Sequence, residues 1–370
     1  MSRISALLVH LLLCAFVLTG CRAIQRPAAA SEQPLKAADT GVAEAALPMD
    51  PEVRVGKLPN GFTYYVRPNS ATPERAELWL VVNAGSVLEE EDQQGLAHFL
   101  EHIQFQGTEH FPGPEVLRFL QSLGTEFGPE INAYTSFDVT VYTLQTPTDD
   151  PKQVQQALDL LADWSGSASL DADAIEAERD IIVEEWRTRE LDADGRVSEA
   201  LYKTLLAGSR YVERLPIGDM EIVRAASAAT LRRFYQAWYR PDNMAVIAVG
   251  DCADVDEVDA WIRTRFGELP APVAPLERPD LTVPDYGNTS VQIITDPEIP
   301  TTSVSVAYRQ PDRTLLTTDD YRTLLVDYLA VMMLNPRYKE IARQPEAAFL
   351  FASAGMSDLV RGVELDTINV

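Results

Sequence analysis

Most of the chain between residues 51 and 370 carries hydrophobic residues at the spacings that strands and helices require. Runs rich in β-branched and aromatic residues predict strands at 53–58, 62–66, 76–84, 131–145 and 244–249, the first two joined at the turn Pro59-Asn60-Gly61. Apolar residues at helical spacing predict helices around residue 98 and at 114–123, 154–165, 173–190 and 226–238. This mixture indicates an α+β fold, in which helices pack on a mainly antiparallel sheet.

The region 268–288 interrupts this pattern, because it holds five prolines among acidic residues. Proline interrupts both helices and sheet ladders, so we expect a linker here, between a first domain at 51–267 and a second at 289–370. The elements predicted in the second domain are strands at 290–295, 303–308 and 347–354 and a helix at 319–343. The chain stops at Val370 within a stretch that itself resembles a strand, so we expect this second domain to be incomplete.

Residues 1–20 form a predicted lipoprotein signal peptide. Arg3 precedes an apolar run at 4–18, which is too short for a stable membrane span. The segment ends in Leu-Thr-Gly-Cys, which resembles the bacterial lipoprotein cleavage box with Cys21 as the lipidated residue. An ordinary signal peptide with an incidental Cys21 is the alternative.

The residues after Cys21 bear on location. By resemblance to the sorting rules of Gram-negative bacteria, a residue other than Asp at Arg22 implies the outer membrane. We therefore expect a periplasmic protein that is anchored by its lipid. Residues 21–50 are rich in Ala, Pro and polar residues and predict a flexible tether.

Charge and cysteine content narrow the choice of partners. The formal net charge is −25, with 56 acidic against 31 basic residues, so nucleic acid is not an expected partner. Cys14 would leave with the signal and Cys21 would be acylated, so only Cys252 remains and no intrachain disulfide is expected.

Two of the four histidines lie four residues apart, at His98 and His102, with Glu101 between them. On a helix, this spacing places both imidazoles on one face, while Leu96, Phe99 and neighbouring apolar residues cluster on the other side. The arrangement suits a zinc ion that activates a water, with Glu101 as general base. The alternative is an exposed helix on which these residues meet by chance.

A catalytic zinc needs a third protein ligand, and the predicted helix at 173–190 offers two candidates. Glu178 and Glu185 are seven residues apart, so they share one face with two isoleucines. Burying carboxylates beside isoleucine is costly unless a cation compensates. Ordinary surface acids on a half-exposed helix are the competing interpretation, and the spacing alone does not choose between Glu178 and Glu185.

The chain resembles the insulinase/pitrilysin family of zinc peptidases, in particular its bacterial periplasmic processing-protease-like members. The resemblance rests on five motifs that occur in the family's order: residues 95–108 around the histidines, 132–135, 178–185, 216–218 and 238–244. It implies a processing-peptidase-like metallohydrolase domain with one zinc, held by His98, His102 and Glu185. Glu101 would then be the base and Glu178 a supporting residue. The gap between His102 and Glu185 is a few residues longer than is usual in the family, which leaves Glu178 as the second choice of ligand.

By the same resemblance, Asn132 and Ala133 begin a strand at the sheet edge beside the zinc, where a substrate could add as a further strand. An equally weighted alternative is that Asn132 only caps a turn. His110 lies beyond Gly107 and is expected in a loop rather than at the metal.

The expected function is that of a zinc metalloendopeptidase acting on peptides or unfolded protein segments. Members of the family build a chamber from four related domains, in one chain or two, and this chain would supply the first domain and part of the second. A second-half domain or partner chain is therefore expected. The competing interpretations are a non-catalytic binding or assembly subunit and an inactive truncated product.

Overall fold

The computed structural model describes residues 45–124, 131–252, 254–274, 276–285, 287–313 and 315–370. The predicted signal peptide, Cys21 and most of the predicted tether lie outside these residues. The described chain forms two compact units. The larger contains residues 48–302 and 359–363, and the smaller contains 45–47, 303–358 and 364–370.

The larger unit is built on a six-stranded sheet with the strand order β1-β2-β6-β3-β5-β4. Only β2 and β6 run parallel, so the expectation of a mainly antiparallel sheet is confirmed. The strands are β1 (Arg54–Lys57), β2 (Thr63–Pro68), β3 (Arg75–Val82), β4 (Ile131–Thr135), β5 (Thr140–Pro147) and β6 (Met244–Gly250).

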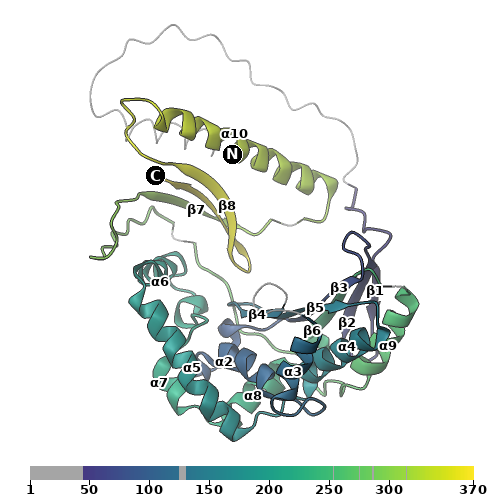
Figure 1. Cartoon of the computed structure of the whole chain (residues 1–370). Coiled ribbons are helices and arrows are strands. Elements are labelled where there is room, and N and C mark those ends of the chain that lie inside the picture. Colours follow the sequence, from purple (N-terminus) through teal and green to yellow (C-terminus); the bar gives the residue numbers. More distant parts are fainter. Residues whose placement is uncertain (1–44, 125–130, 253, 275, 286, 314) are drawn as a thin grey trace. The chain divides into compact units, whose positions relative to one another are not determined.

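Alternation along the strands explains which face of the sheet is covered. In β3, Leu78 and Leu80 are fully buried, whereas Trp79 between them is 40% exposed. In β6, Val246 lies opposite Leu80 and is also buried. Because successive side chains point to opposite faces, one face of the sheet carries the core and receives the helices, as Figure 1 shows.

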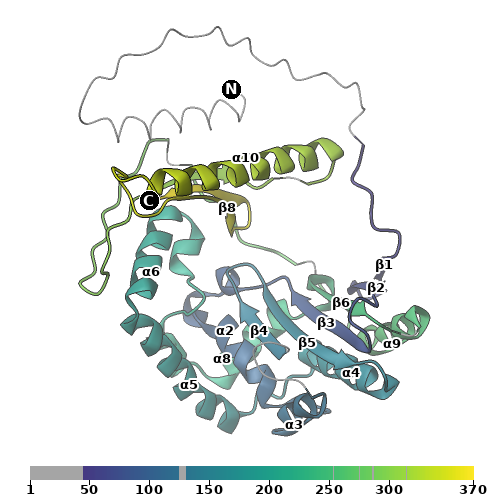
Figure 2. The ribbon, with the colours of Figure 1, turned by 45° about the horizontal axis from the view of Figure 1, so that its top comes forward.

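The helices of this unit are α2 (Leu96–Ile103), α3 (Glu115–Ser122), α4 (Pro151–Gly166), α5 (Ala172–Leu191), α6 (Ala193–Leu205), α7 (Met220–Ala225), α8 (Ala228–Trp238) and α9 (Val255–Gly267). Five of them fall where the pattern predicts a helix, whereas α6, α7 and α9 were not predicted. In both Figure 1 and Figure 2, α2 lies between β4 and α5. The helix with the histidine motif is therefore placed between a sheet edge and the helix with the candidate glutamates.

The single strand predicted at 131–145 is wrong, because the chain turns back on itself between β4 and β5. The Ser136 amide donates to the Val139 carbonyl at 2.8 Å, and the Ser136 hydroxyl accepts from the amides of Asp138 and Val139. Phe137 is buried at the turn. Because Phe137 at the turn is itself apolar, the hydrophobic pattern continues from β4 into β5, and the sequence predicts one strand where there are two.

The strand predicted at 290–295 is also wrong, since these residues form no regular element. Val291 and Ile293 are each 82% exposed, so no packed layer covers their apolar side chains. Residues 276–283, which fall within the predicted linker, nevertheless pack against the core of the larger unit. Arg278 donates to Asn243 Oδ1 at 2.7 Å, and its guanidinium lies 5.7 Å from the centre of the Trp238 ring.

The smaller unit contains a sheet in the order β7-β9-β8 and one long helix. Its elements are β7 (Ser305–Pro311), α10 (Thr318–Ala342), β8 (Ser353–Val360) and β9 (Val363–Asn369). The strand predicted at 347–354 begins only at Ser353, because residues 344–347 still form turns after the helix. In the N-terminal segment, Ala46 forms an isolated antiparallel bridge with Thr317.

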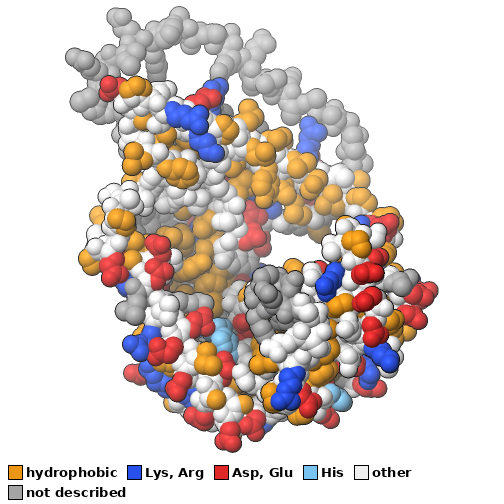
Figure 3. Space-filling model, in the orientation of Figure 1, with side chains coloured by type: hydrophobic (Ala, Val, Ile, Leu, Met, Phe, Trp, Pro, Cys, Tyr) orange, Lys and Arg blue, Asp and Glu red, His pale blue; other side chains and the backbone are white. Residues whose placement is uncertain are grey.

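Helix α10 starts at a capping box, in which Thr317 and Asp320 exchange hydrogen bonds. It buries none of its residues; Met332 and Met333 are 65% and 73% exposed, and Figure 3 shows the hydrophobic side chains of this unit at the surface. Within the described part of the chain, no helix combines the length and the apolar character that a membrane span needs.

Candidate metal centre

The start of α2 is fixed by a buried carboxylate and two glycines. Glu89 is fully buried and accepts from the amides of Gly95 (3.0 Å) and Ala97 (2.7 Å), which caps the helix. Gly95 has φ +94°. A Cβ on Gly218 would lie only 2.1 Å from the Cα of Gly95, so Gly218 must also be a glycine. Gly218 belongs to the motif at 216–218, so that motif serves to let two backbones touch beside α2.

The structure brings His98, His102 and Glu185 together. Their potential ligand atoms all lie within 4.8 Å of one another. Glu185 Oε2 is 3.5 Å from His98 Nε2 and 3.6 Å from His102 Nε2, and the two imidazole rings meet edge to face at 4.8 Å. Helix α2 supplies both nitrogens and α5 supplies the oxygen. Figure 3 shows histidine beside acidic side chains at the surface of the larger unit.

Glu178 occupies a different place, on the far edge of the His102 ring. Its Oε1 is 2.8 Å from His102 Nδ1, and its Oε2 accepts from Gln106 Nε2 at 2.7 Å. Glu178 is only 6% exposed. Because a carboxylate only accepts, His102 donates from Nδ1 to Glu178, and its other ring nitrogen, Nε2, faces Glu185.

Burial and the neighbouring carboxylates shift the pKa of His102 in opposite directions. Burial lowers its pKa, but the hydrogen bond that His102 donates to Glu178 and the charges of Glu101, Glu178 and Glu185 outweigh burial and raise the pKa above its ordinary value. The site is therefore a strongly cation-attracting one. Two imidazole nitrogens and one carboxylate, with one imidazole backed by a second carboxylate, are the donor types that catalytic zinc sites use.

Glu101 is buried between α2 and the sheet edge. Its Oε2 accepts from the hydroxyl of Thr135 at 2.6 Å. Thr135 is the last residue of β4, so the edge strand holds the carboxylate predicted to be the base. Sequence reasoning did not single out Thr135 or Gln106, although both lie within the motifs at 132–135 and 95–108. The only signal was a polar side chain inside a motif, which is too common to be specific.

Asn132 and Ala133 lie on β4, which is the last strand in the sheet order. Asn132 is exposed, and its Oδ1 accepts from the amide of Ala133 at 2.9 Å. Asn132 therefore sits in an edge strand that pairs with β5, and its side chain bonds to its own strand.

His110 is not part of the cluster. Its Nδ1 lies 2.7 Å from Asp163 Oδ1, and its side chain is 69% exposed. It belongs to the loop between α2 and α3, as the sequence predicts.

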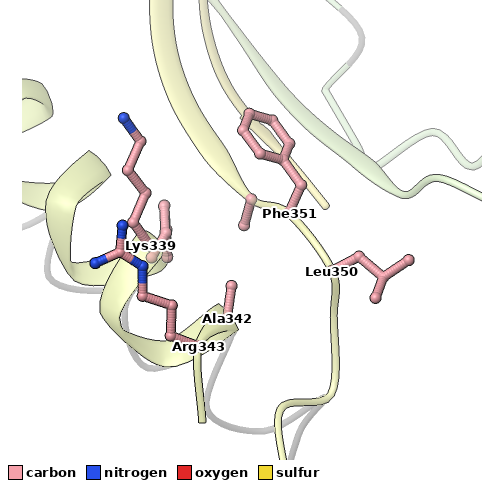
Figure 4. A pocket seen from close by; sticks show the side chains of 7 residues that line it. Lys339, Ala342, Arg343, Leu350 and Phe351 are labelled. Carbon is pink, nitrogen blue, oxygen red and sulfur yellow. The ribbon is translucent and has the colours of Figure 1, made fainter.

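A shallow pocket of about 210 Å³ lies in the smaller unit, between the end of α10 and the start of β8. Figure 4 shows Lys339, Arg343, Leu350 and Phe351 around it. No histidine or carboxylate is among the residues that line it, so it lacks the groups that the hydrolytic chemistry needs.

Comparison with known proteins shows the family to which the chain belongs. Residues 64–215 match the insulinase family (peptidase family M16), and residues 225–360 match the inactive domain of the same peptidases. A zinc protease PQQL-like protein of Arabidopsis thaliana is 39% identical over 310 residues, which are 84% of this chain and 32% of that protein.

Two solved structures of the periplasmic protease PqqL from Escherichia coli are similar at 34% identity and cover 88% of this chain. The structure of its first half gives a TM-score of 0.80 with 69% of that chain covered, and the whole protease gives 0.81 with 36% covered. The chain therefore belongs to the insulinase family of peptidases. It spans about a third of the length of the curated relatives that it matches.

Proposed function

We propose that this protein is a zinc-dependent endopeptidase, in which His98, His102 and Glu185 hold one zinc ion. The observation that carries the proposal is the convergence of three ligand atoms from two helices within 4.8 Å. Glu178 supports the site from behind His102 instead of binding the metal, because its two oxygens already contact His102 and Gln106.

His98, His102 and Glu185 would hold the zinc ion, which would supply the Lewis-acid chemistry that polarises a scissile carbonyl and lowers the pKa of a bound water. Glu101 would take the proton of the attacking water and pass it to the leaving amine. Thr135 supports this role, because its hydroxyl holds one carboxylate oxygen of Glu101 and so restricts the direction in which the base points. Glu178 would keep the His102 ring in the tautomer that offers Nε2.

Substrates would be peptides or unfolded protein segments that add to the edge of β4 in extended form. Main-chain hydrogen bonds would provide most of the binding there, so Asn132 and Ala133 would contact the substrate backbone and the specificity would be broad. The position of β4 at the end of the sheet order supports this arrangement.

The proposal also covers where the protein lies in the cell and what it assembles with. We infer a periplasmic protein held at the outer membrane by a lipid on Cys21, and the periplasmic relative supports the compartment. The matched region covers only 36% of the whole protease PqqL, which is therefore much longer. A second-half domain or partner chain would complete the substrate chamber.

The test is peptidase activity on a library of quenched peptides, together with zinc content. The wild-type chain is expected to hold close to one zinc and to cleave, whereas Glu101→Gln keeps the zinc and loses cleavage. Zinc without cleavage in the wild type would mean that a second half is required, and adding the C-terminal half of a relative would then restore activity. A wild-type chain that binds no zinc would overturn the proposal.

A further inference from the structure

Gln106 contacts the metal centre indirectly, through a carboxylate. Its Nε2 donates to Glu178 Oε2 at 2.7 Å, and the other oxygen of the same carboxylate is 2.8 Å from His102 Nδ1. The three side chains form one continuous path from the short 3-10 helix Gln104–Gln106, through α5, to a predicted metal ligand on α2.

The backbone that carries Gln106 is held rigidly. Gln104, two residues earlier, exchanges a reciprocal pair of hydrogen bonds with Trp164 on α4: Gln104 Nε2 donates to the Trp164 carbonyl at 2.9 Å, and Trp164 Nε1 donates to the Gln104 carbonyl at 2.8 Å. Both residues are fully buried. Side chains on a clamped backbone lose little further freedom when they bond, so Gln106 is well placed to fix its neighbour.

The residue after Gln106 strengthens this restraint. Gly107 has φ +142°, and a Cβ there would lie 2.7 Å from the Gly113 amide nitrogen. The Gly107 carbonyl also accepts from the Ser169 hydroxyl at 2.8 Å. The turn therefore cannot shift easily, and Gln106 is fixed on both sides.

Glu178 needs such a partner. At 6% exposure, water cannot replace a lost donor at low cost, and a carboxylate with one unsatisfied oxygen would be free to rotate away from His102. Groups that hold the second nitrogen of a ligating histidine typically change metal affinity 10–100-fold when they are lost. Gln106 holds the carboxylate that holds His102, so we expect its loss to change the metal affinity as well.

We propose that Gln106 is a positioning residue that sets the zinc affinity of the centre, by locking the Glu178 carboxylate against His102. This inference rests on the proposed zinc site. It assigns no catalytic step to Gln106, which lies behind the ligands rather than among them.

The test is the zinc dissociation constant of the full-length chain, measured by competition with a chromophoric chelator. Gln106→Met keeps the shape of the side chain but removes the donor, and it is expected to weaken zinc binding about 10-fold. Gln106→Lys restores a donor to Glu178 and is expected to bind zinc more tightly than Gln106→Met. The matched control is Gln145→Met, because Gln145 also donates to a glutamate at 2.7 Å, but on the exposed face of the sheet.

The outcomes separate this proposal from the previous one. Unchanged zinc affinity in Gln106→Met, beside a large loss in His102→Ala, would overturn the role of Gln106 and leave the zinc site intact. An equal loss in Gln145→Met would overturn it as well, since the effect would not depend on position. If the wild type and His102→Ala both bind no zinc, the zinc site itself is wrong.

Discussion

Two histidine–carboxylate pairs lie close together in the sequence and nearly match in geometry, yet their surroundings differ. His102 Nδ1 is 2.8 Å from Glu178, and His110 Nδ1 is 2.7 Å from Asp163. The His102 side chain is 23% exposed, and its Nε2 faces His98 and Glu185. The His110 side chain is 69% exposed.

The carboxylates differ as well. Glu178 divides its oxygens between His102 and the amide of Gln106. Asp163 is buried and serves the loop, since it also accepts from the Thr108 hydroxyl at 2.5 Å and from the His110 amide at 3.0 Å. The comparison teaches that a short bond between histidine and carboxylate does not define a metal site. What defines it is the group that the opposite ring nitrogen faces.

The largest difference is expected from removing each imidazole. His102→Ala should weaken zinc binding by more than about 100-fold, because it deletes a proposed ligand and not merely a proposed supporting group. His110→Ala should leave the zinc dissociation constant unchanged. Titration of both variants with zinc against a chelator measures this, and equal losses in the two variants would show that the pairs are equivalent.

The next difference concerns the carboxylates. Glu178→Gln should weaken zinc binding about 10–100-fold, since an amide holds the His102 tautomer less firmly than a carboxylate does. Asp163→Asn is the matched change in the other pair and should not alter zinc affinity. Comparable affinities for Glu178→Gln and the wild type would remove Glu178 from the site.

For the stability of the zinc-free protein, the change at Asp163 should matter more than the change at Glu178. Asp163→Asn weakens three hydrogen bonds of a buried carboxylate and should lower the free energy of unfolding by about 2 kcal/mol. Urea denaturation of the zinc-free protein measures this value without a contribution from the metal. An unchanged unfolding midpoint would mean that Asp163 does not hold the loop.

The smallest effect is expected from the exposed pair as pH changes. The hydrogen bond to Asp163, followed by its charge, raises the pKa of His110 above the ordinary 6.5. The folded state binds this proton more tightly than the unfolded state does. The contribution of the His110–Asp163 pair to the free energy of unfolding is therefore complete below pH 6.5 and is lost as pH rises through the raised pKa. His110→Ala should therefore cost less than about 1 kcal/mol at pH 6, and the difference from the wild type should shrink towards pH 9. A cost that is constant over this pH range would exclude the ion pair as its source.

Local pattern predicted the elements whose periodicity is strong and failed where neighbours decide. The strands β2, β3 and β6 and the helices α2, α4, α5 and α8 follow from alternation or helical spacing. The hairpin within 131–145 was missed because its turn carries an apolar residue that the core accepts. The strand predicted at 290–295 did not form, because an apolar run becomes a strand only where another strand pairs with it.

The sequence by itself determined that His98, Glu101 and His102 lie together, because residues three and four apart share a helix face wherever the helix lies. It could not decide between Glu178 and Glu185, since seven-residue spacing places both on one face of α5. The packing of α5 against α2 separates the two: Glu185 lies near both Nε2 atoms, whereas Glu178 lies beside His102 Nδ1, and this difference supports Glu185 as the proposed ligand.

The supporting residues were decided by the tertiary structure alone. Gln106 meets Glu178 across 72 residues of sequence, and Thr135 meets Glu101 across 34. Contacts of this kind leave no periodic trace in one sequence, because they depend on where two separate elements come to rest in the folded chain.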